Sequence, residues 1–452
     1  MLPVILMSLF LLYFPLPGSD PSTPWHWLAA GVLGVAGLNA LLCWIGSAAA
    51  ARLGASGTQA GAARSVRTLR LTNVAVLGCV ALDVFVLRWP LLVEKALAAL
   101  PYLPLAGELM LLGPALVMIA TAMTFHYRLR HWRLGAGLRL HHYLALRMRT
   151  EVAIVLAPWL VLALASDVAS ALLEGSRHSP YGEWIEALLP ILLLAAAVAA
   201  GPWLLRAVWR TSPLSAGPLR ERLEGLCRAT RFRVTDILVW HTYGSLPNAA
   251  VIGVVPWVRY VLLTDALLES CTDEEIESVF AHEIGHIKHH HLTFYLLFAA
   301  AFAAFYANIV DALSGWRLVA PLSDVLAAEL TQGQAVVMLV FAAFYWMFVF
   351  GFLSRRLEQQ ADVFAVKVSS GPSALIAALQ KLALLSGTAT GVGSWRHFSI
   401  SRRTRFLAEF PERPDRLRRA ERALYVAQWL IAVLFLVAVL RLGLRAADLA
   451  GS

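Results

Sequence analysis

The chain of 452 residues is too apolar to be a protein of the aqueous phase alone. Hydrophobic residues make up 59% of it and charged residues only 15%, against about 25% charged residues in an average soluble domain. This composition excludes a purely soluble enzyme, and it excludes a disordered chain, which needs a low apolar fraction. A net charge of +9 would suit a nucleic-acid-binding protein, but arginines also accumulate in the cytoplasmic loops of membrane proteins. We therefore expect a lipid bilayer, and no nucleic acid, as a partner.

Nine apolar stretches have the length, or nearly the length, of a helix that crosses a bilayer, which is about 20 residues. In chain order they cover residues 3–17, 26–50, 72–89, 103–125, 152–172, 184–206, 292–315, 333–353 and 423–444. The first is short, and it lacks the basic start and the cleavage site of a signal peptide. We therefore expect eight or nine spans, with the apolar stretch 90–102 at the membrane interface.

The uneven distribution of arginines predicts which segments face the cytoplasm. Basic clusters lie between the second and third spans, in 126–149 and in 206–233, whereas 18–25 and 173–183 hold a single arginine, Arg177. Cytoplasmic loops carry the excess of basic residues, so we expect the basic segments on that side. Only four of the 38 basic residues are lysines, and this composition favours a bacterial protein of the inner membrane.

The alternation of spans and polar segments predicts five parts. They are an N-terminal multi-span membrane domain (1–206), a first cytoplasmic half of a catalytic domain (207–291), a transmembrane hairpin (292–353), a second cytoplasmic half (354–422), and a C-terminal span with a tail (423–452). Both polar halves are expected on the same side of the membrane.

The first polar half is predicted to contain two helices and a small sheet. Pro218 is a favourable first residue for a helix, and Thr272 with Glu275 forms the T-x-x-E capping box of another. Three β-prone runs between them predict a sheet of two or three strands. These runs cover 237–240, 249–252 and 258–263.

The helix after the capping box carries the motif HExxH, from His282 to His286. Residues four apart lie on one face of a helix, so both imidazoles point the same way and are able to bind one Zn²⁺, with Glu283 beside the metal-bound water. The motif also occurs by chance, and a helix end with incidental histidines is the alternative. For the following run, 289–291, we favour this second interpretation: a polar run where a helix meets the membrane.

A third zinc ligand is predicted in the second polar half. Glu358 and Asp362 are also four residues apart on a predicted helix. Glu358 is a candidate ligand, and Asp362 is able to support a ligand histidine by a hydrogen bond. Read alone, this ExxxD pattern is typical of a solvated helix face, but two spans between the motifs would return both helices to one side of the membrane.

Four motifs in order resemble the membrane-bound zinc metallopeptidases that include HtpX and the CaaX prenyl proteases. They are Asn-Ala-Ala-Val-Ile-Gly (248–253), Leu-Thr-Asp-Ala-Leu-Leu (263–268), the HExxH helix (279–287), and Arg-Arg-Leu-Glu-Gln-Gln-Ala-Asp (355–362). The resemblance implies one zinc ion per chain, bound by His282, His286 and Glu358, with Glu283 as the general base.

The resemblance also implies roles around the zinc. Asp362 matches the family's acid that supports a ligand, and Asn248 matches an asparagine that contacts the substrate backbone, although a turn residue after a proline is an equal alternative. The family commonly has His-Pro, four residues, then Arg. Here Arg416 matches the family's arginine, to which the resemblance gives a catalytic role. Phe410 replaces the histidine and leaves its role unfilled, and His397 is a weak substitute.

The resemblance implies a mainly α protein: a polytopic α-helical membrane protein with a small α+β zincin-like catalytic domain on the cytoplasmic side. The implied activity is that of a zinc metalloendopeptidase that cleaves membrane-associated or misfolded polypeptides. A CaaX-type protease for lipidated C-termini is an alternative, and so is a protease-like sensor without activity. A transporter is another alternative, because Asp83, Asp167 and Asp311 lie in or near apolar runs.

Overall fold

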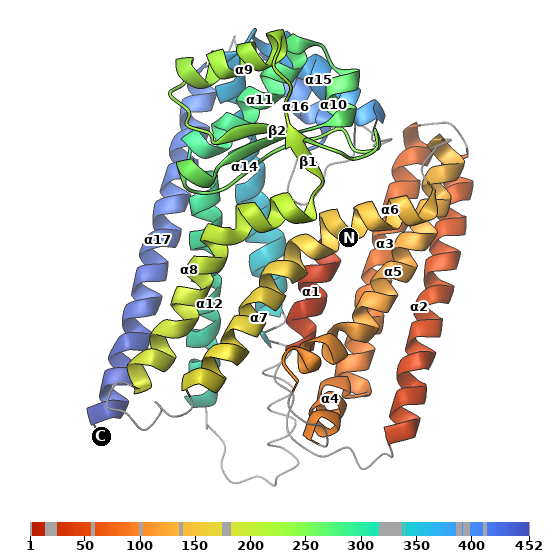
Figure 1. Ribbon diagram of the computed structural model, residues 1–452, viewed down its shortest axis with the longest axis vertical. Coiled ribbons are helices and arrows are strands. Elements are labelled where there is room, and N and C mark those ends of the chain that lie inside the picture. The colour runs from red at the N-terminus through yellow and green to blue at the C-terminus, as the bar shows by residue number, and fades with distance from the viewer. Residues whose placement is uncertain are drawn as a thin grey trace.

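The computed structural model describes residues 2–13, 25–55, 59–98, 103–134, 139–173, 182–315, 337–338, 340–385, 391, 398–409 and 414–451. Long helices form most of the described chain, and a small sheet with shorter helices lies at one end of them (Figure 1). The predicted fold class, a polytopic helical membrane protein with a small α+β part, is therefore confirmed.

Seven of the described helices are long and apolar enough to cross a membrane. They cover His26–Gly54, Arg64–Val86, Ala106–Tyr127, Leu140–Val168, His291–Ile309, Val340–Val368 and Glu421–Leu444. Each overlaps a predicted span. The other two predictions correspond to α1 (Leu2–Leu12), which is only 11 residues long, and to α8 (Gly182–Val208), a 27-residue helix that is not among the seven.

The N-terminal helices form a bundle with its own core. In chain order they are α1, α2 (Trp25–Gly54), α3 (Gln59–Ala81), the π-helix η1 (Leu82–Val86), α4 (Trp89–Ala98), α5 (Ala106–Leu134), α6 (Leu140–Arg147), the π-helix η2 (Met148–Val152) and α7 (Ala153–Leu173). Met118, Ile119 and Met123 of α5 are almost completely buried among α1, α2 and α3. This core is separate from the core around the sheet, which the bundle reaches through Ile154 of α7.

A second group of long helices supports the polar end directly. It contains α8, α12 (His291–Gly315), the π-helix η5 (Phe344–Phe350) with its continuation α14 (Gly351–Val368), and α17 (Pro414–Gly451). Phe298 of α12 packs on Tyr345 and Phe350, and the Tyr345 hydroxyl donates to the Phe298 carbonyl at 2.8 Å. The first polar half ends where α12 begins, and η5 leads directly into α14 of the second half. The contact between α12 and η5 therefore holds the two polar halves beside each other.

The sheet has four strands in the order β1-β2-β4-β3. They are β1 (Thr211–Pro213), β2 (Asp236–Trp240), β3 (Ala249–Ile252) and β4 (Tyr260–Thr264), and only β2 and β4 run parallel. The three predicted runs are confirmed as β2, β3 and β4. The prediction missed β1, because three residues ending in proline carry no strand pattern.

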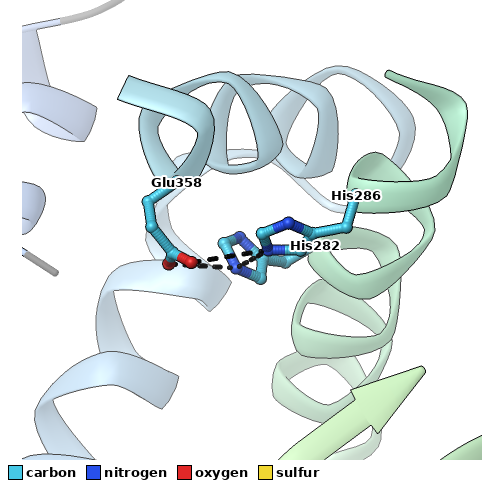
Figure 2. Close-up of side chains that lie close together, drawn as sticks. All are labelled: His282, His286 and Glu358. Atoms are coloured by element: carbon cyan, nitrogen blue, oxygen red, sulfur yellow. Dashed lines mark hydrogen bonds and ion pairs between the residues drawn. The ribbon is translucent and has the colours of Figure 1, made fainter. Parts of the chain in front are cut away.

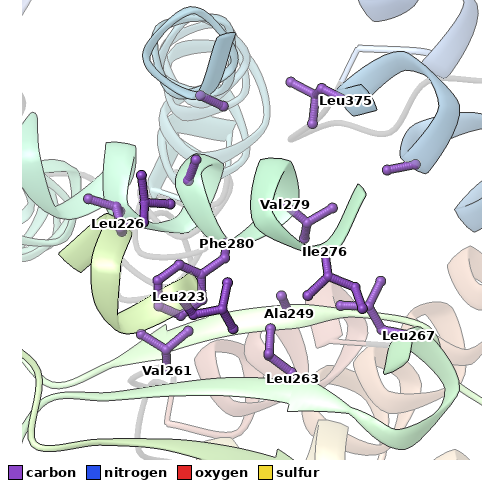
Figure 3. Close-up of a cluster of buried hydrophobic side chains, with 14 of the residues drawn as sticks. Leu223, Leu226, Ala249, Val261, Leu263, Leu267, Ile276, Val279, Phe280 and Leu375 are labelled. Carbon is purple, nitrogen blue, oxygen red and sulfur yellow. The ribbon is translucent and has the colours of Figure 1, made fainter. Parts of the chain in front are cut away.

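Each face of the sheet packs against a different part of the molecule. On one face, Val261 and Leu263 contact Phe280 and Ile276 of α11 (Asp273–Lys288), together with α9 (Pro218–Ala229), as Figure 3 shows. On the other face, Leu238 and Leu262 pack on Trp209 near the end of α8. The sheet therefore joins α11 to the ends of the membrane helices. The remaining short helices are α10 (Asp265–Ser270), α15 (Pro372–Leu385) and α16 (Ile400–Glu409).

The turn between β3 and β4 requires glycine. Gly253 has a φ of +99°, and a Cβ atom there would lie 2.1 Å from the carbonyl oxygen of Val258. No other residue fits this conformation without strain. The turn places β3 at the edge of the sheet, with one side of its backbone not paired within the sheet.

Candidate metal centre

Helix α11 begins at the predicted capping box. The Thr272 hydroxyl accepts from the Glu275 backbone at 3.4 Å, and the Thr272 N–H donates to the Glu275 carboxylate at 2.9 Å. Lys381 of α15 binds the same carboxylate at 2.7 Å. These contacts confirm the predicted cap, which satisfies backbone donors at the helix start, and they tie the start of α11 to the second polar half.

The two histidines of HExxH point the same way from α11 (Figure 2). The Nε2 atoms of His282 and His286 are 3.2 Å apart, and His282 is only 8% exposed. Glu358 of α14 faces them, with carboxylate oxygens 3.6 Å from Nε2 of His282 and 3.7 Å from Nε2 of His286. Residues 76 positions apart in the sequence are therefore brought together by the packing of α11 on α14.

These three side chains fit a metal ion. One ligand atom from each of His282, His286 and Glu358 lies within 4.8 Å of the others. Two imidazole nitrogens and one carboxylate oxygen are a donor set that catalytic zinc sites use, with a fourth position left for water or substrate. The predicted ligands are therefore close enough to bind one ion together.

A close approach of two helices makes this geometry possible. A Cβ atom added at Gly285 of α11 would lie 3.0 Å from the Cα atom and 3.3 Å from the Cβ atom of Ala361 of α14. Small residues let two helix backbones come close together. Here the close approach brings the two histidines of α11 within reach of Glu358 of α14.

Asp362 lies behind His282. Its Oδ1 atom is 2.9 Å from Nδ1 of His282, and its side chain is completely buried. Burial alone would lower the pKa of His282, but the carboxylates of Asp362 and Glu358 raise it to about 10. The predicted supporting acid is thus in position to orient the ring, as carboxylates commonly do for metal-binding histidines.

Arg403 of α16 is a residue of the site that the sequence analysis missed. Its Nε donates to Oδ2 of Asp362 at 2.9 Å and its Nη2 to Oδ1 at 2.5 Å, while Nη1 lies 3.8 Å from Glu358. The nearby carboxylates raise the pKa of this buried guanidinium. It compensates the charge of Asp362, whose burial would otherwise be costly.

A signal for Arg403 exists in the sequence. In the family pattern the arginine follows the histidine by six positions. His397 and Arg403 have this spacing, and so do Phe410 and Arg416, the pair assigned above. His397 and Phe410 lie outside the described residues. Arg416 is in the first turn of α17, its side chain is not described, and its catalytic role stays a prediction.

His291 is the second residue that sequence reasoning missed. It is completely buried, its Nδ1 lies 2.9 Å from Nδ1 of His286, and its Nε2 lies 2.9 Å from the Gln360 amide oxygen. The chain turns at His290, which has a φ of +56°, and so returns His291 to the ligand histidine. The interpretation of 289–291 as a polar run at the membrane surface is therefore wrong for His291.

Glu283 and Asn248 lie along the edge strand. Glu283 of α11 lies near β3, where the Val251 backbone lowers the pKa of its carboxylate, but burial has the larger effect and raises that pKa to about 7. Asn248 directly precedes β3 and is exposed, and its backbone N–H donates to the Thr264 hydroxyl at 2.8 Å. The structure thus brings the predicted base beside the free edge of the sheet, with Asn248 at the start of that edge.

Comparison with known proteins supports the resemblance. Residues 213–424 match peptidase family M48. The family resemblance that the motifs predict is therefore confirmed, and the matched region contains His282, His286, Glu358 and Arg403. The N-terminal bundle lies outside the M48 match.

Relatives of both predicted kinds are found. A CAAX prenyl protease 1 homolog of Oryza sativa subsp. japonica is 32% identical over 41% of this chain and 44% of that protein. A protease HtpX homolog of Campylobacter hominis is 29% identical over 37% of this chain and 57% of that protein. The chain thus spans about half the length of these relatives.

The fold likeness extends further along the chain than the sequence likeness. The crystal structure of S. mikatae Ste24p matches with a TM-score of 0.55 and 17% identity, and the match covers 86% of this chain and all of that chain. The region that matches M48 (213–424, called the M48 part below) and much of the N-terminal bundle therefore share the arrangement of that protein.

Proposed function

We propose that this protein is a membrane-embedded, zinc-dependent endopeptidase that hydrolyses peptide bonds of membrane-associated or misfolded proteins. The observation that carries the proposal is the convergence of His282, His286 and Glu358 within 4.8 Å, with Glu283 on the same helix. One Zn²⁺ per chain would be held by these three residues. Zinc, when bound, would polarise the scissile carbonyl and lower the pKa of water.

The protein's own residues divide the remaining work. Glu283 takes a proton from the attacking water and donates it to the leaving amine, as a positioned carboxylate does in general acid–base catalysis. The free edge of β3 pairs with an extended peptide backbone, and Asn248 contacts the same backbone. Asp362 and Arg403 fix the ring of His282, and His291 fixes that of His286.

The proposal is tested by separating metal binding from hydrolysis. We expect Glu283→Gln to retain about one zinc per chain and to lose proteolysis by at least about 100-fold, because the amide does not accept the proton. His286→Ala should lose both zinc and proteolysis. The measurement is metal analysis of the purified full-length chain, together with cleavage of an unfolded membrane-protein substrate with and without a chelator. Wild-type cleavage by zinc-loaded Glu283→Gln would contradict the mechanism.

A CaaX-type protease is the second candidate. One observation favours it: the relative from Oryza sativa is named a CAAX prenyl protease 1 homolog. A farnesylated peptide and its unmodified counterpart, offered to the same preparation, separate the two candidates. Cleavage only of the lipidated peptide would favour the second.

We further propose that the end of the molecule that holds the sheet faces the cytoplasm of a bacterium from the inner membrane. The arginines around the junction of α2 and α3, from the end of α5 to η2, and from the end of α8 to residue 233 support this orientation through the excess of arginine in cytoplasmic loops.

A further inference from the structure

A basic cavity of about 390 Å³ lies outside the metal centre, where the end of the molecule that holds the sheet meets the membrane helices. Its lining includes five basic residues or histidines: Arg231, Arg233, Arg259, Lys288 and His290. No acidic side chain is among the described residues that line it. A concave surface with only positive charge attracts an anion.

The cavity walls hold their cations in place. Arg259 is only 8% exposed, and its guanidinium donates to the backbone carbonyls of Gly253, Val254 and Arg233 rather than to a carboxylate. It also lies 5.5 Å from the centre of the Phe232 ring. Because carbonyls leave its charge uncompensated, this buried arginine adds a fixed positive charge to the cavity.

Other cations lie at the open side. Arg231 and Arg233 are exposed, and Lys288 donates to the Arg231 carbonyl at 3.2 Å. Guanidinium groups bind phosphate oxygens in a bidentate manner, and lysine adds a point charge. The combination of a buried arginine and two exposed arginines therefore suits a phosphate group better than a carboxylate or a neutral ligand.

The cavity lies at the level of the membrane surface. Leu292 and Thr293, in the first turn of the span α12, are part of its lining. Pro256 of the short helix η4 (Pro256–Val258) also lines it, and η4 contacts α8. The next residue, Trp257, is 74% exposed. Exposed tryptophan is typical of the headgroup region of a bilayer. A site for a soluble anion would not need a tryptophan there.

We propose that this cavity binds the phosphate of an anionic phospholipid, with the acyl chains lying along the first turns of α12. Basic pockets beside spanning helices bind lipid headgroups in this manner. The site is distinct from the metal centre and does not depend on proteolytic activity. It would fix the height and tilt of the sheet and its covering helices relative to the bilayer.

The test uses the purified full-length chain in detergent micelles, titrated with phosphatidylglycerol, with phosphatidylcholine, and with inorganic phosphate. Native mass spectrometry counts the bound lipid. Two variants remove the same charge: Arg231→Gln with Arg233→Gln in the cavity, and Arg64→Gln with Arg67→Gln, two exposed arginines near the start of the span in α3. Zinc content reports whether each variant is folded.

We expect one phosphatidylglycerol to bind in preference to phosphatidylcholine. The cavity variant should weaken this binding by about fivefold for each arginine removed, or about 25-fold in total, whereas the α3 variant should bind as the wild type does. Lys288→Gln should weaken it by about fivefold and provides the test if the double variant loses zinc.

Three outcomes would overturn the proposal. The first is equal weakening in both double variants, which indicates diffuse attraction of a basic protein to anionic lipid. The second is equal binding of the two lipids. The third is displacement of phosphatidylglycerol by inorganic phosphate at low millimolar concentration, which assigns the cavity to a free phosphate.

Discussion

At the scale of single residues, hydrogen bonds to the candidate ligands complete the metal centre. His291 binds His286, Gln360 binds His291, and the Gln360 amide donates to the Tyr425 hydroxyl of α17 at 3.2 Å. This chain of hydrogen bonds fixes the ring of His286 from the side opposite the metal. It also connects the metal centre to a membrane-spanning helix.

We expect His291→Ala to lower zinc affinity by about 10- to 100-fold, the usual effect of removing a partner of a metal ligand. His289→Ala is the matched control, because its ring packs on His291 and Phe364 rather than on a ligand. Competition with a fluorescent zinc chelator measures the affinity of both variants. Equal losses would show that the effect is not specific to the contact with His286.

The ion pair between Arg403 and Asp362 should carry a large share of local stability. Arg403→Gln leaves a completely buried carboxylate without its cation, and we expect a loss of about 3–5 kcal/mol. Arg402→Gln is the control, since this exposed arginine only lies over the Phe398 ring at 4.1 Å. The midpoint of thermal unfolding measures both. Similar midpoints for the two variants would exclude a structural role for the ion pair.

At the scale of elements, the distance between α11 and α14 decides the geometry of the site. Gly285→Ala adds a methyl group 3.0 Å from the Ala361 backbone, so we expect a destabilisation of about 1–3 kcal/mol and weaker zinc binding. Gly78→Ala is the control, because nothing lies within 4 Å of the added Cβ atom in α3. Unchanged zinc affinity in Gly285→Ala would show that α14 shifts without moving Glu358.

The elements of the M48 part were largely predictable, because each follows from a local pattern. The capping box at Thr272, the helix after Pro218 and three strands are where the sequence predicts them. The strand β1 was not predictable, since its pairing with β2 comes from the path of the chain after α8 rather than from its own three residues.

At the scale of the whole molecule, the orientation in the membrane is the open prediction. Arg228 of α9 is exposed at the end that holds the sheet, whereas Leu103, 60% exposed, lies between α4 and α5 at the other end (Figure 1). In a variant without Cys43, Cys79, Cys227 and Cys271, we expect an impermeant maleimide to label Leu103→Cys in intact spheroplasts.

The counterpart, Arg228→Cys, should be labelled only after the membrane is permeabilised. The opposite pattern would place the end that holds the sheet outside the cytoplasm. Labelling of both positions in intact spheroplasts would show that at least one of them does not lie where the orientation requires.

The sequence alone determined the membrane class and the candidate metal ligands. An apolar fraction of 59% requires lipid, and spacings of four residues place His282 beside His286 and Glu358 beside Asp362 on their own helices. Only the tertiary structure decided which side chains support them. Arg403 and His291 come from α16 and from the start of α12, and no local periodicity predicts contacts between separate elements. The basic cavity has the same origin, because its cations lie in the segment after α9, directly before β4 and at the end of α11, which meet only in the folded chain.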